Sequence, residues 1–357
     1  MYILGLGTAT PPNRYTQTEC WAAFQASPQF PELTARAWTI LKAVLLGSNG
    51  ITSRCLALDS LKEAFDLNPD TLHRRFVRHA PLLATDAAWR ALRDAGRQAE
   101  DIEAVIVSTC TGYLCPGLTS YVAESLGLRR DVLALDLVGQ GCGAALPNMR
   151  TAEALLAAGR CRYALSVCVE VCSAAFYLDN DPGVLISACL FGDGAGAAVL
   201  ASEPPSRNRH IQWTTSGSAL VPADRDALRF EQHQGMLRNV LKRSVPSLAA
   251  TQAEAVLDEV LAKAGVSRSD IRTWIWHAGG RDVLEAVQER MTLSAGDLRW
   301  SRDVLNEYGN LSSAFVYFVL QEALRKNAPG GWWWLSSFGA GFSCHGALLE
   351  VGPVRAS

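Results

Sequence analysis

The stretch DVLALDLVGQGCGAALPNMRTAEALLAAG, residues 131–159, decides the predicted fold of this chain. Residues 131–137 are apolar enough to predict a buried strand, and apolar residues at helical spacing follow directly. The motif GQGCG between them places Cys142 in a strand-to-helix turn that only glycines let the backbone make. The dipole of a helix stabilises a cysteine thiolate at its N-terminus. We therefore expect Cys142 to be a nucleophile, with a buried structural cysteine as the alternative.

The composition is that of a large folded protein with little net charge. The 357 residues are 49% apolar and 19% charged, with a net charge of −2, which excludes a disordered chain. No basic block indicates a nucleic-acid partner, and no apolar stretch reaches membrane-spanning length. Met1 leads into a strand-like segment without a signal peptide, and the ten cysteines lack the paired spacing of a metal site. We expect a cytoplasmic protein with free thiols and no bound metal.

Strand-like runs alternate with helical patterns along the chain, which predicts a layered α/β fold. The polar run ASEPPSRNRH interrupts the alternation, so we expect two halves, 1–202 and 203–357, of related order although no sequence repeat is visible. The expected strands are 2–7, 102–109, 132–137, 163–169, 195–201, 211–214, 272–277, 332–336 and 344–351. The expected helices are 84–95, 119–126, 143–158, 248–264, 281–291 and 312–326.

Two further residues complete a chemical set with Cys142. His277 ends the predicted strand TWIWH and precedes two glycines, so its ring is expected in the crevice where α/β sheets usually bind ligands. Asn310 lies in YGNLSSA just before a predicted helix, where a helix-capping role is the alternative. Both side chains can donate hydrogen bonds to a developing oxyanion, and a histidine activates a neighbouring thiol.

Seven segments of the chain carry a family resemblance. Three contain the chemical set: GQGCGAALPNMR, WIWHAGGRDVL and YGNLSSA. The other four are LGLGTATPPNRY, CTGYLCPGLTSYVAESLGLR, LFGDGAGAAVL and SSFGAGFSCHGALLEV. Together they resemble the type III polyketide synthases, the chalcone and stilbene synthase family of the thiolase superfamily, over nearly the whole length.

The resemblance implies a thiolase-like fold in which two related α/β halves form a five-layered αβαβα core. It implies Cys142 as the nucleophile, His277 and Asn310 as the pair that hydrogen-bonds the thioester oxygen, and Phe191 as a gatekeeper between a tunnel and a cavity. The implied reaction acylates Cys142, decarboxylates a malonyl thioester, joins the two by Claisen condensation and closes the chain to a pyrone or resorcinol-type ring. It also implies a homodimer and no cofactor besides the substrates, malonyl-CoA and an acyl-CoA or acyl carrier protein thioester.

The resemblance further assigns a substrate cavity. Because Cys172 and Ala175 are small, we expect a roomy cavity that favours an aliphatic or large acyl starter. The loop residue Cys115 is expected to reach across the dimer interface. The residues expected to line the cavity are Cys110, Cys115, Cys172, Ala175, Asn239, Ser312 and Phe338.

One departure from the family pattern concerns the coenzyme A clamp. The family's cluster of Lys and Arg is reduced here to Lys42, with Arg54, Arg243 and Arg281 near positions that could assist. This weak clamp makes an acyl carrier protein a second candidate for delivering the acyl group, because its acidic helix could meet basic residues such as Lys242.

Two other departures concern the cavity and its neighbourhood. Asn239 falls near the position of the family's second gatekeeper phenylalanine, and loss of that ring is expected to widen the tunnel. Ala340 stands where a proline is common, which favours a more flexible C-terminal loop. His345 nearby is expected to be structural rather than a second base.

Other classes of protein use the same residue types. A ketoacyl synthase III shares the Cys-His-Asn set, but its histidine segment typically reads HQAN where this chain has HAGG. A stand-alone condensing enzyme that joins two acyl chains into a pyrone would need no strong coenzyme A clamp. A Cys-His-Asn thiol hydrolase would need neither Phe191 nor two α/β halves, and a non-catalytic partner subunit would usually lack the nucleophile.

Overall fold

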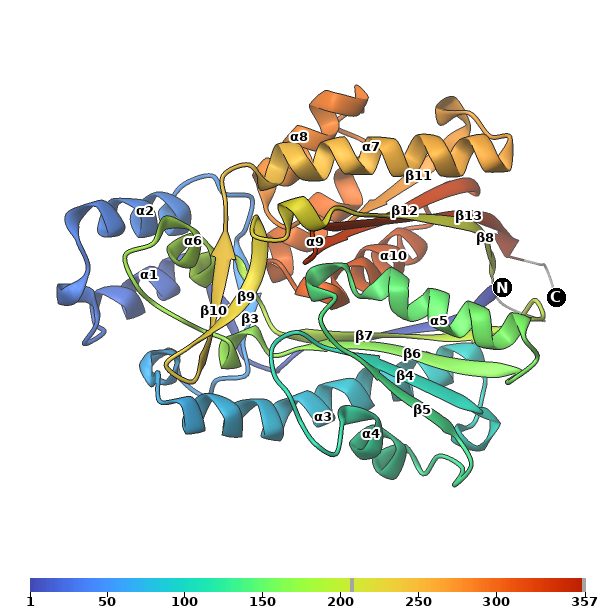
Figure 1. The fold of residues 1–357 in the computed structure, drawn as a ribbon, viewed down its shortest axis with the longest axis horizontal. Helices are drawn as coiled ribbons and strands as arrows, with labels where there is room; N and C mark the ends of the chain where they lie inside the picture. Colours follow the sequence, from blue (N-terminus) through green and yellow to red (C-terminus); the bar gives the residue numbers. More distant parts are fainter. Residues whose placement is uncertain (206–208, 355–357) are drawn as a thin grey trace.

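Two β-sheets, joined along one edge and separated by helices, form the frame of the protein (Figure 1). The computed structural model describes residues 1–205 and 209–354. Helices α7 (Val245–Ala264) and α8 (Arg281–Met291) cover one outer face, and α3 (Pro69–Ala95) and α4 (Leu118–Leu126) cover the other. Helices α5 (Ala145–Ala157) and α10 (Phe315–Arg325) lie between the sheets. The layers therefore run α, β, α, β, α, and the predicted thiolase-like core is confirmed.

The two sheets meet through a single residue pair, Tyr2 with Gln212. The first sheet has the order β5-β4-β6-β7-β1 and the second β11-β12-β13-β8. The strands of the first sheet are β1 (Tyr2–Ala9), β4 (Ala104–Ser108), β5 (Leu133–Leu137), β6 (Tyr163–Glu170) and β7 (Gly194–Ala201). Those of the second are β8 (Arg209–Leu220), β11 (Ile271–Trp276), β12 (Gly331–Gly339) and β13 (Ser343–Val354).

The two sheets repeat one topology, although the sequence shows no repeat. In the first, β4 and β6 are parallel, while β7 is antiparallel to both β6 and β1. In the second, β11 and β12 are parallel, while β13 is antiparallel to both β12 and β8. The central helix of each half, α5 or α10, directly precedes the corresponding strand, β6 or β12. The expected boundary at 202/203 falls between β7 and β8, and residues 206–208 of the polar run lie outside the described residues.

Close packing of α3 on β1 explains the glycines of the N-terminal strand. A Cβ atom at Gly7 would lie 2.1 Å from the backbone oxygen of Ala87, and one at Gly5 would lie 2.3 Å from the backbone nitrogen of Ala95. No side chain fits at either position, so glycine lets the helix backbone rest on the strand. The helix is capped by Asn68, whose side chain accepts two backbone N–H groups of the first turn.

A smaller group of elements lies beside this core (Figure 1). The sequence patterns did not predict these elements. Their helices are α1 (Gln17–Gln25), α2 (Ala35–Leu46) and α6 (Pro182–Leu190). Their strands are β2 (Arg14–Thr16) paired with β3 (Ser53–Cys55), and β9 (Leu228–His233) paired with β10 (Met236–Leu241). Helix α9 (Arg299–Tyr308), which was also not predicted, packs on α10 and β11 within the second half.

The prediction of a buried strand at residues 131–137 is wrong in one respect. The strand β5 forms, but it is the edge strand of its sheet, and Leu133 is 38% exposed. An apolar run therefore indicated a strand correctly but did not indicate its burial, because burial depends on which strands flank it. In the described ranges 1–205 and 209–354, no helix has both the length and the apolar character needed to span a membrane.

Candidate active site

Cys142 lies in the short turn Gly141–Gly143 that leads into α5, and it is only 8% exposed. Gly141 adopts a left-handed conformation with φ +57°. A Cβ atom at Gly143 would come within 3.0 Å of the backbone nitrogen of Gly339 at the end of β12. Glycine at these positions therefore lets the nucleophile turn of the first half lie against the C-terminal loop of the second.

Asn310 lies between α9 and α10, where its backbone pairs with the end of α6. Its N–H donates to the carbonyl of Leu190 at 2.8 Å, and its carbonyl accepts from Gly192 at 3.0 Å, so Asn310 lies beside Phe191. The side-chain Nδ2 donates to the carbonyl of Gly279 at 3.1 Å, and Oδ1 accepts from the N–H of Ser312 at 2.8 Å. The amide is held at both ends and still has one hydrogen to donate to a ligand.

His277 directly follows β11 and is 2% exposed. Its backbone N–H donates to the carbonyl of Ser336 at 2.9 Å, and its ring centroid lies 5.4 Å from that of Phe315 and 6.4 Å from that of Phe338. Burial lowers the pKa of His277 to about 3, so the imidazole is neutral at pH 7. Among the described residues, Nδ1 has no hydrogen-bond partner.

Cys142 is a neutral thiol in the structure. Burial raises its pKa to about 12, which outweighs the hydrogen bond that Ser312 Oγ donates to the sulfur at 3.3 Å. The stabilisation of the thiolate that was expected from the helix N-terminus is outweighed here, because desolvation disfavours the charge more than the surrounding donors stabilise it. Both the thiol and the imidazole are uncharged before substrate arrives.

A tunnel of about 650 Å³ brings the predicted chemical set together. Cys142, His277 and Asn310 all line it, together with Phe191 and Phe338. The lining residues that are exposed to solvent mark its mouth: Ala43 on α2, Ser48 just after that helix, and the charged residues Lys242, Arg243, Arg281 and Asp282. Inside the mouth the wall is apolar and includes Ile40, Val44, Leu241, Val245 and Ala249.

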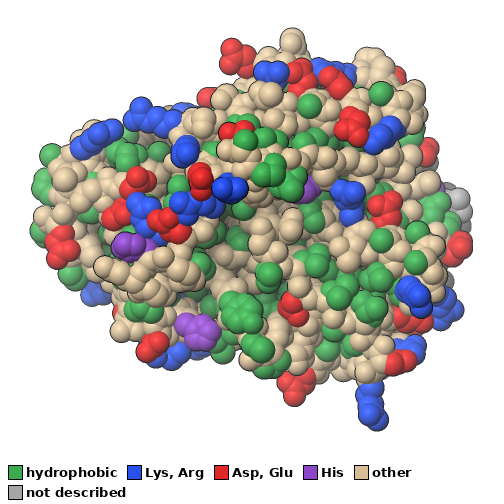
Figure 2. Space-filling model, in the orientation of Figure 1, with side chains coloured by type: hydrophobic (Ala, Val, Ile, Leu, Met, Phe, Trp, Pro, Cys, Tyr) green, Lys and Arg blue, Asp and Glu red, His purple; other side chains and the backbone are tan. Residues whose placement is uncertain are grey.

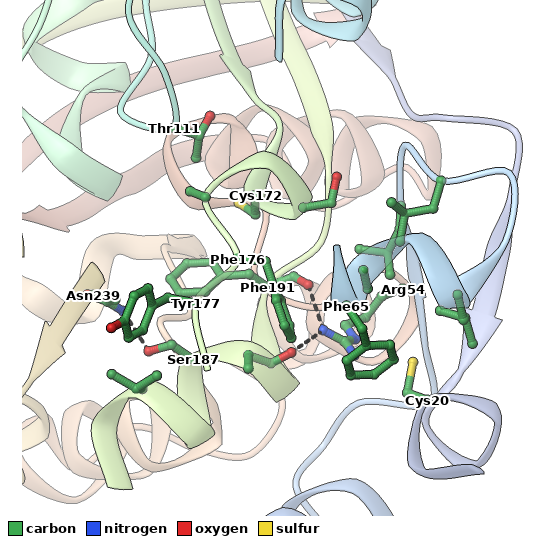
Figure 3. A pocket seen from close by; sticks show the side chains of 18 of the residues that line it. Cys20, Arg54, Phe65, Thr111, Cys172, Phe176, Tyr177, Ser187, Phe191 and Asn239 are labelled. Carbon is green, nitrogen blue, oxygen red and sulfur yellow. Dashed lines mark hydrogen bonds between the residues drawn. The ribbon is translucent and has the colours of Figure 1, made fainter. Parts of the chain in front are cut away.

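A second, inner cavity lies beyond Phe191 (Figure 3). Four of the residues predicted to line the substrate cavity do so here, namely Cys172, Ala175, Asn239 and Ser312. Its volume is only about 60 Å³, so the expectation of a roomy cavity is wrong for this state. Small residues on one wall do not set the volume, because aromatic rings from other elements fill the space. These rings belong to Phe24, Phe65, Phe176, Tyr177 and Phe230.

Several residues do not have the positions or roles that were predicted for them. Arg54 is 4% exposed, and its guanidinium donates to the carbonyls of Ala188 and Phe191, both at 2.9 Å (Figure 3), so it is no surface clamp for phosphates. Lys42 is exposed on α2 but does not line the tunnel. Cys115 is exposed and lines neither cavity of its own chain, and its reach across a dimer interface stays a prediction. The corrections for Arg54 and Lys42 arise because sequence proximity to a motif does not fix which way a side chain points.

Arg243 and Arg281 do reach the tunnel mouth, as predicted. Arg281 is partly neutralised there, because it pairs with Asp282 at 3.1 Å and with Glu285 at 3.4 Å. Only some of the expected positive charge is therefore available to a phosphate group.

The sequence interpretation missed a buried carboxyl group next to Cys142. Glu170 at the end of β6 is fully buried, and burial raises its pKa. It accepts hydrogen bonds from Thr111 Oγ1 at 2.9 Å and from the Cys110 thiol at 3.3 Å, and Ser312 Oγ lies 3.3 Å from it. Cys110 therefore belongs to this network rather than to the lining of either cavity. The single charged residue in the apolar run SVCVEVC was the available signal.

His345 has the structural role that was expected. It is 7% exposed, its Nδ1 lies 2.8 Å from Ser218 Oγ, and burial lowers its pKa to about 4. Neither cavity includes it.

In the described part of the chain, no group of three or more His, Cys, Asp or Glu side chains is arranged to hold a metal ion.

A buried Cys-His-Asn set at the end of a tunnel, contributed by two halves of a thiolase-like fold, defines a condensing enzyme. Comparison with known families then specifies the class. The chalcone and stilbene synthase C-terminal domain family matches residues 213–352, and the FAE1/type III polyketide synthase-like family matches residues 32–215. The chain belongs to the type III polyketide synthases, and a ketoacyl synthase III-like enzyme is not favoured.

Relatives along the full chain agree with this family. The 3,5-dihydroxyphenylacetyl-CoA synthase of Streptomyces toyocaensis is 30% identical over 98% of this chain and 89% of its own. The solved structure of PKS-I from the brown alga Ectocarpus siliculosus has a TM-score of 0.88 and 28% identity, covering 98% of this chain and 97% of its own. The 1,3,6,8-tetrahydroxynaphthalene synthase of Streptomyces coelicolor A3(2) shares the fold, with a TM-score of 0.88 at 24% identity, and the alignment covers 99% and 100% of the two chains.

Proposed function

We propose that Cys142, His277 and Asn310 carry the polyketide synthase reaction of this chain. The observation that supports this assignment is that the three residues come from both halves of the fold and line one tunnel beside Phe191. A thioester reaching Cys142 through the tunnel would place its carbonyl oxygen near His277 and the free amide hydrogen of Asn310.

The proposed reaction begins with acyl transfer. Neutral His277 accepts the thiol proton of Cys142 as the sulfur attacks the starter thioester, and the thiol of the carrier leaves with a proton. A malonyl thioester then loses carbon dioxide, and the enolate oxygen receives hydrogen bonds from His277 and Asn310. The enolate carbon attacks the acyl carbonyl on Cys142, which frees the thiolate and lengthens the chain by two carbons. These steps need no metal or organic cofactor, because the thioesters themselves supply the activation.

Phe191 and the ring closure complete the proposal. The Phe191 ring gives the malonyl carboxylate an apolar wall, which favours its conversion to neutral carbon dioxide. We propose a pyrone or resorcinol-type product. The name of the S. toyocaensis relative supports the second, since a 3,5-dihydroxyphenyl group is a resorcinol ring.

The carrier of the acyl group is proposed to be coenzyme A. Lys242, Arg243 and the partly neutralised Arg281 lie at the tunnel mouth, where they could bind the phosphates of coenzyme A. The product named for the S. toyocaensis relative is itself a coenzyme A thioester. An acyl carrier protein is the second candidate, supported by the exposed position of Lys242 and Arg243 at the mouth. A carrier presents only its phosphopantetheine arm, so it needs basic groups around the mouth rather than a nucleotide site.

We further propose a homodimer. The edge strand β5 and the segment after it expose Leu133 and Val138, the latter 60% exposed, and the loop before α4 exposes Tyr113 at 71%. Figure 2 shows hydrophobic side chains gathered on this face of the molecule. A second copy would cover this surface and the open edge of the sheet. We also propose a reducing, cytoplasmic compartment, which the ten free cysteines support.

The test is product analysis by mass spectrometry. Purified enzyme is incubated with malonyl-CoA and a panel of acyl-CoA starters, with Cys142→Ala as the control. Pyrones or resorcinols that disappear in the variant are the expected result. Acylation of Cys142 by carrier-protein thioesters but not by coenzyme A thioesters would show that an acyl carrier protein delivers the acyl group. No acylation and no product in either format would contradict the proposed roles.

A further inference from the structure

Three residues form the passage between the tunnel and the inner cavity. Ser187, Phe191 and Asn239 are the residues that line both spaces in the described chain, and Figure 3 shows all three among the side chains around the inner cavity. Ser187 lies on α6, Phe191 directly follows that helix, and Asn239 lies on β10. Any chain growing from the tunnel into the inner cavity must therefore pass one ring and two polar side chains.

The two polar side chains are bonded to each other across the passage. Asn239 Nδ2 donates to Ser187 Oγ at 2.6 Å, and Ser187 Oγ donates to the carbonyl of Gly183 at 2.7 Å. Asn239 is 7% exposed and Ser187 is 6% exposed, so both are desolvated. The bond uses one of the two amide hydrogens of Asn239, which leaves the other hydrogen and Oδ1 able to bind a ligand.

The surroundings of this pair are apolar. Beyond the passage the inner cavity is lined mainly by aromatic and aliphatic side chains, including Phe230 from the same hairpin, with Arg54, Thr111, Ser173 and Ser312 as its polar members. An apolar side chain at position 239 would fit such surroundings without a desolvation cost. A buried polar group is tolerated only where hydrogen-bond partners satisfy it. The buried amide of Asn239 therefore indicates that the ligand carries a polar group at this point.

We propose that Asn239 and Ser187 form a polar gate that selects acyl chains carrying an oxygen atom near the thioester over plain alkyl chains. The inference rests on the proposed function and names the substrate class of the same site. When a chain passes between Asn239 and Ser187, the two side chains lose the hydrogen bond to each other. A β-keto oxygen on the passing chain can accept a hydrogen bond in its place. An alkyl segment cannot do so and leaves the buried amide unpaired.

Two ligands of equal length test the gate. Acetoacetyl-CoA and butyryl-CoA each carry four acyl carbons, and they differ by the one keto oxygen that the gate is proposed to read. The measurement is the rate of Cys142 acylation by each thioester at subsaturating concentration, followed by intact-protein mass spectrometry. The wild-type protein is expected to favour acetoacetyl-CoA.

The variants separate polarity from packing. Asn239→Leu keeps the side-chain size and removes the polar atoms, so it is expected to lower the acetoacetyl-to-butyryl rate ratio about tenfold or more. Ser187→Ala is expected to change the ratio in the same direction by a smaller factor, and it tests the gate if the first variant folds poorly. Val240→Ala is the matched control, since neighbouring residues on a strand point to opposite faces and Val240 lines neither cavity.

The outcomes distinguish the gate from the proposed function. A ratio that falls in Asn239→Leu and Ser187→Ala but not in Val240→Ala supports the gate. A ratio unchanged within about twofold in both gate variants overturns it, even when the enzyme still makes polyketides from malonyl-CoA. Failure of both thioesters to acylate the wild-type Cys142 overturns the proposed function and the gate together.

Discussion

The central helices of the two halves begin in the same way but carry different chemistry. Helices α5 and α10 each follow a short turn, Gly141–Gly143 in the first half and Ser312–Ala314 in the second. The first residue of each turn is left-handed, with φ +57° at Gly141 and +50° at Ser312. The repeated topology thus extends to the backbone at the active site, while the side chains have diverged.

The difference shows what each half contributes. Glycine adopts the left-handed conformation freely, and it lets Cys142 lie against the opposite half. Serine adopts it at a cost of about 1–2 kcal/mol, and its hydroxyl reaches both Cys142 and Glu170. In the proposed mechanism the first half therefore supplies the nucleophile, and the second supplies the groups that stabilise charge around it. The strain at Ser312 is consistent with a functional position.

The largest expected effect is loss of the nucleophile. Cys142→Ala is expected to lower polyketide formation by more than about 10³-fold, because no other group accepts the acyl chain. Decarboxylation of malonyl-CoA is expected to persist, since His277 and Asn310 belong to the other half. Release of labelled carbon dioxide beside product yield measures both. Loss of decarboxylation together with condensation would contradict this division of labour.

Removing the hydrogen-bond donors is the reciprocal change. Asn310→Ala is expected to reduce malonyl-CoA decarboxylation by about 10²–10³-fold, the usual effect of losing one oxyanion donor. Acylation of Cys142 is expected to fall less, and intact-protein mass spectrometry measures it. Asn310→Asp is the matched variant, because it keeps the acceptor for the Ser312 N–H but removes the amide donor. Equal losses of decarboxylation and of Cys142 acylation would contradict the donor role. They would mean that the Asn310 side chain acts only by holding the backbone of Gly279 and Ser312 in place.

The third prediction concerns pH. Because burial raises the pKa of Cys142 to about 12, the thiolate fraction rises with pH, and inactivation by iodoacetamide is expected to accelerate about tenfold per unit between pH 6 and 9. His277, with a pKa of about 3, stays neutral across this range and adds no inflection. Cys142→Ala controls for labelling of other thiols. A rate independent of pH above 6 would reveal a thiolate–imidazolium pair across the two halves.

The smallest expected effects concern the two left-handed residues. Gly141→Ala is expected to destabilise the protein by about 1–2 kcal/mol from the strained backbone alone, and its Cβ atom would also lie 3.1 Å from that of Ala340. Ser312→Gly relieves the backbone strain but removes the hydroxyl that contacts Cys142 and Glu170, so it is expected to destabilise the protein by about 1–3 kcal/mol. Denaturant unfolding measures both free energies. An unchanged free energy of unfolding in Gly141→Ala would show that the left-handed backbone at this turn places no demand on the side chain.

Part of the fold and site was predictable from the sequence because local patterns carry it. The glycines around Cys142 indicated the turn, and α8 begins and ends at the predicted residues, Arg281 and Met291. The hairpin β9–β10 was missed because LRFEQH and MLRNVL show no clean alternation of apolar and polar residues. The gate was half predicted: Asn239 was expected near the tunnel, but its partner Ser187 had no sequence signal.

The sequence by itself determined the chemical set, its local turns and the family to which the chain belongs, since these depend on residue type and short-range spacing. Only the tertiary structure decided which residues meet. It placed Arg54 under Phe191 rather than at the surface, brought Glu170 beside Cys142, and filled the inner cavity with aromatic rings. The physical reason is that burial and contact are set by elements distant in sequence, which desolvate a charge or close a cavity without leaving a local pattern.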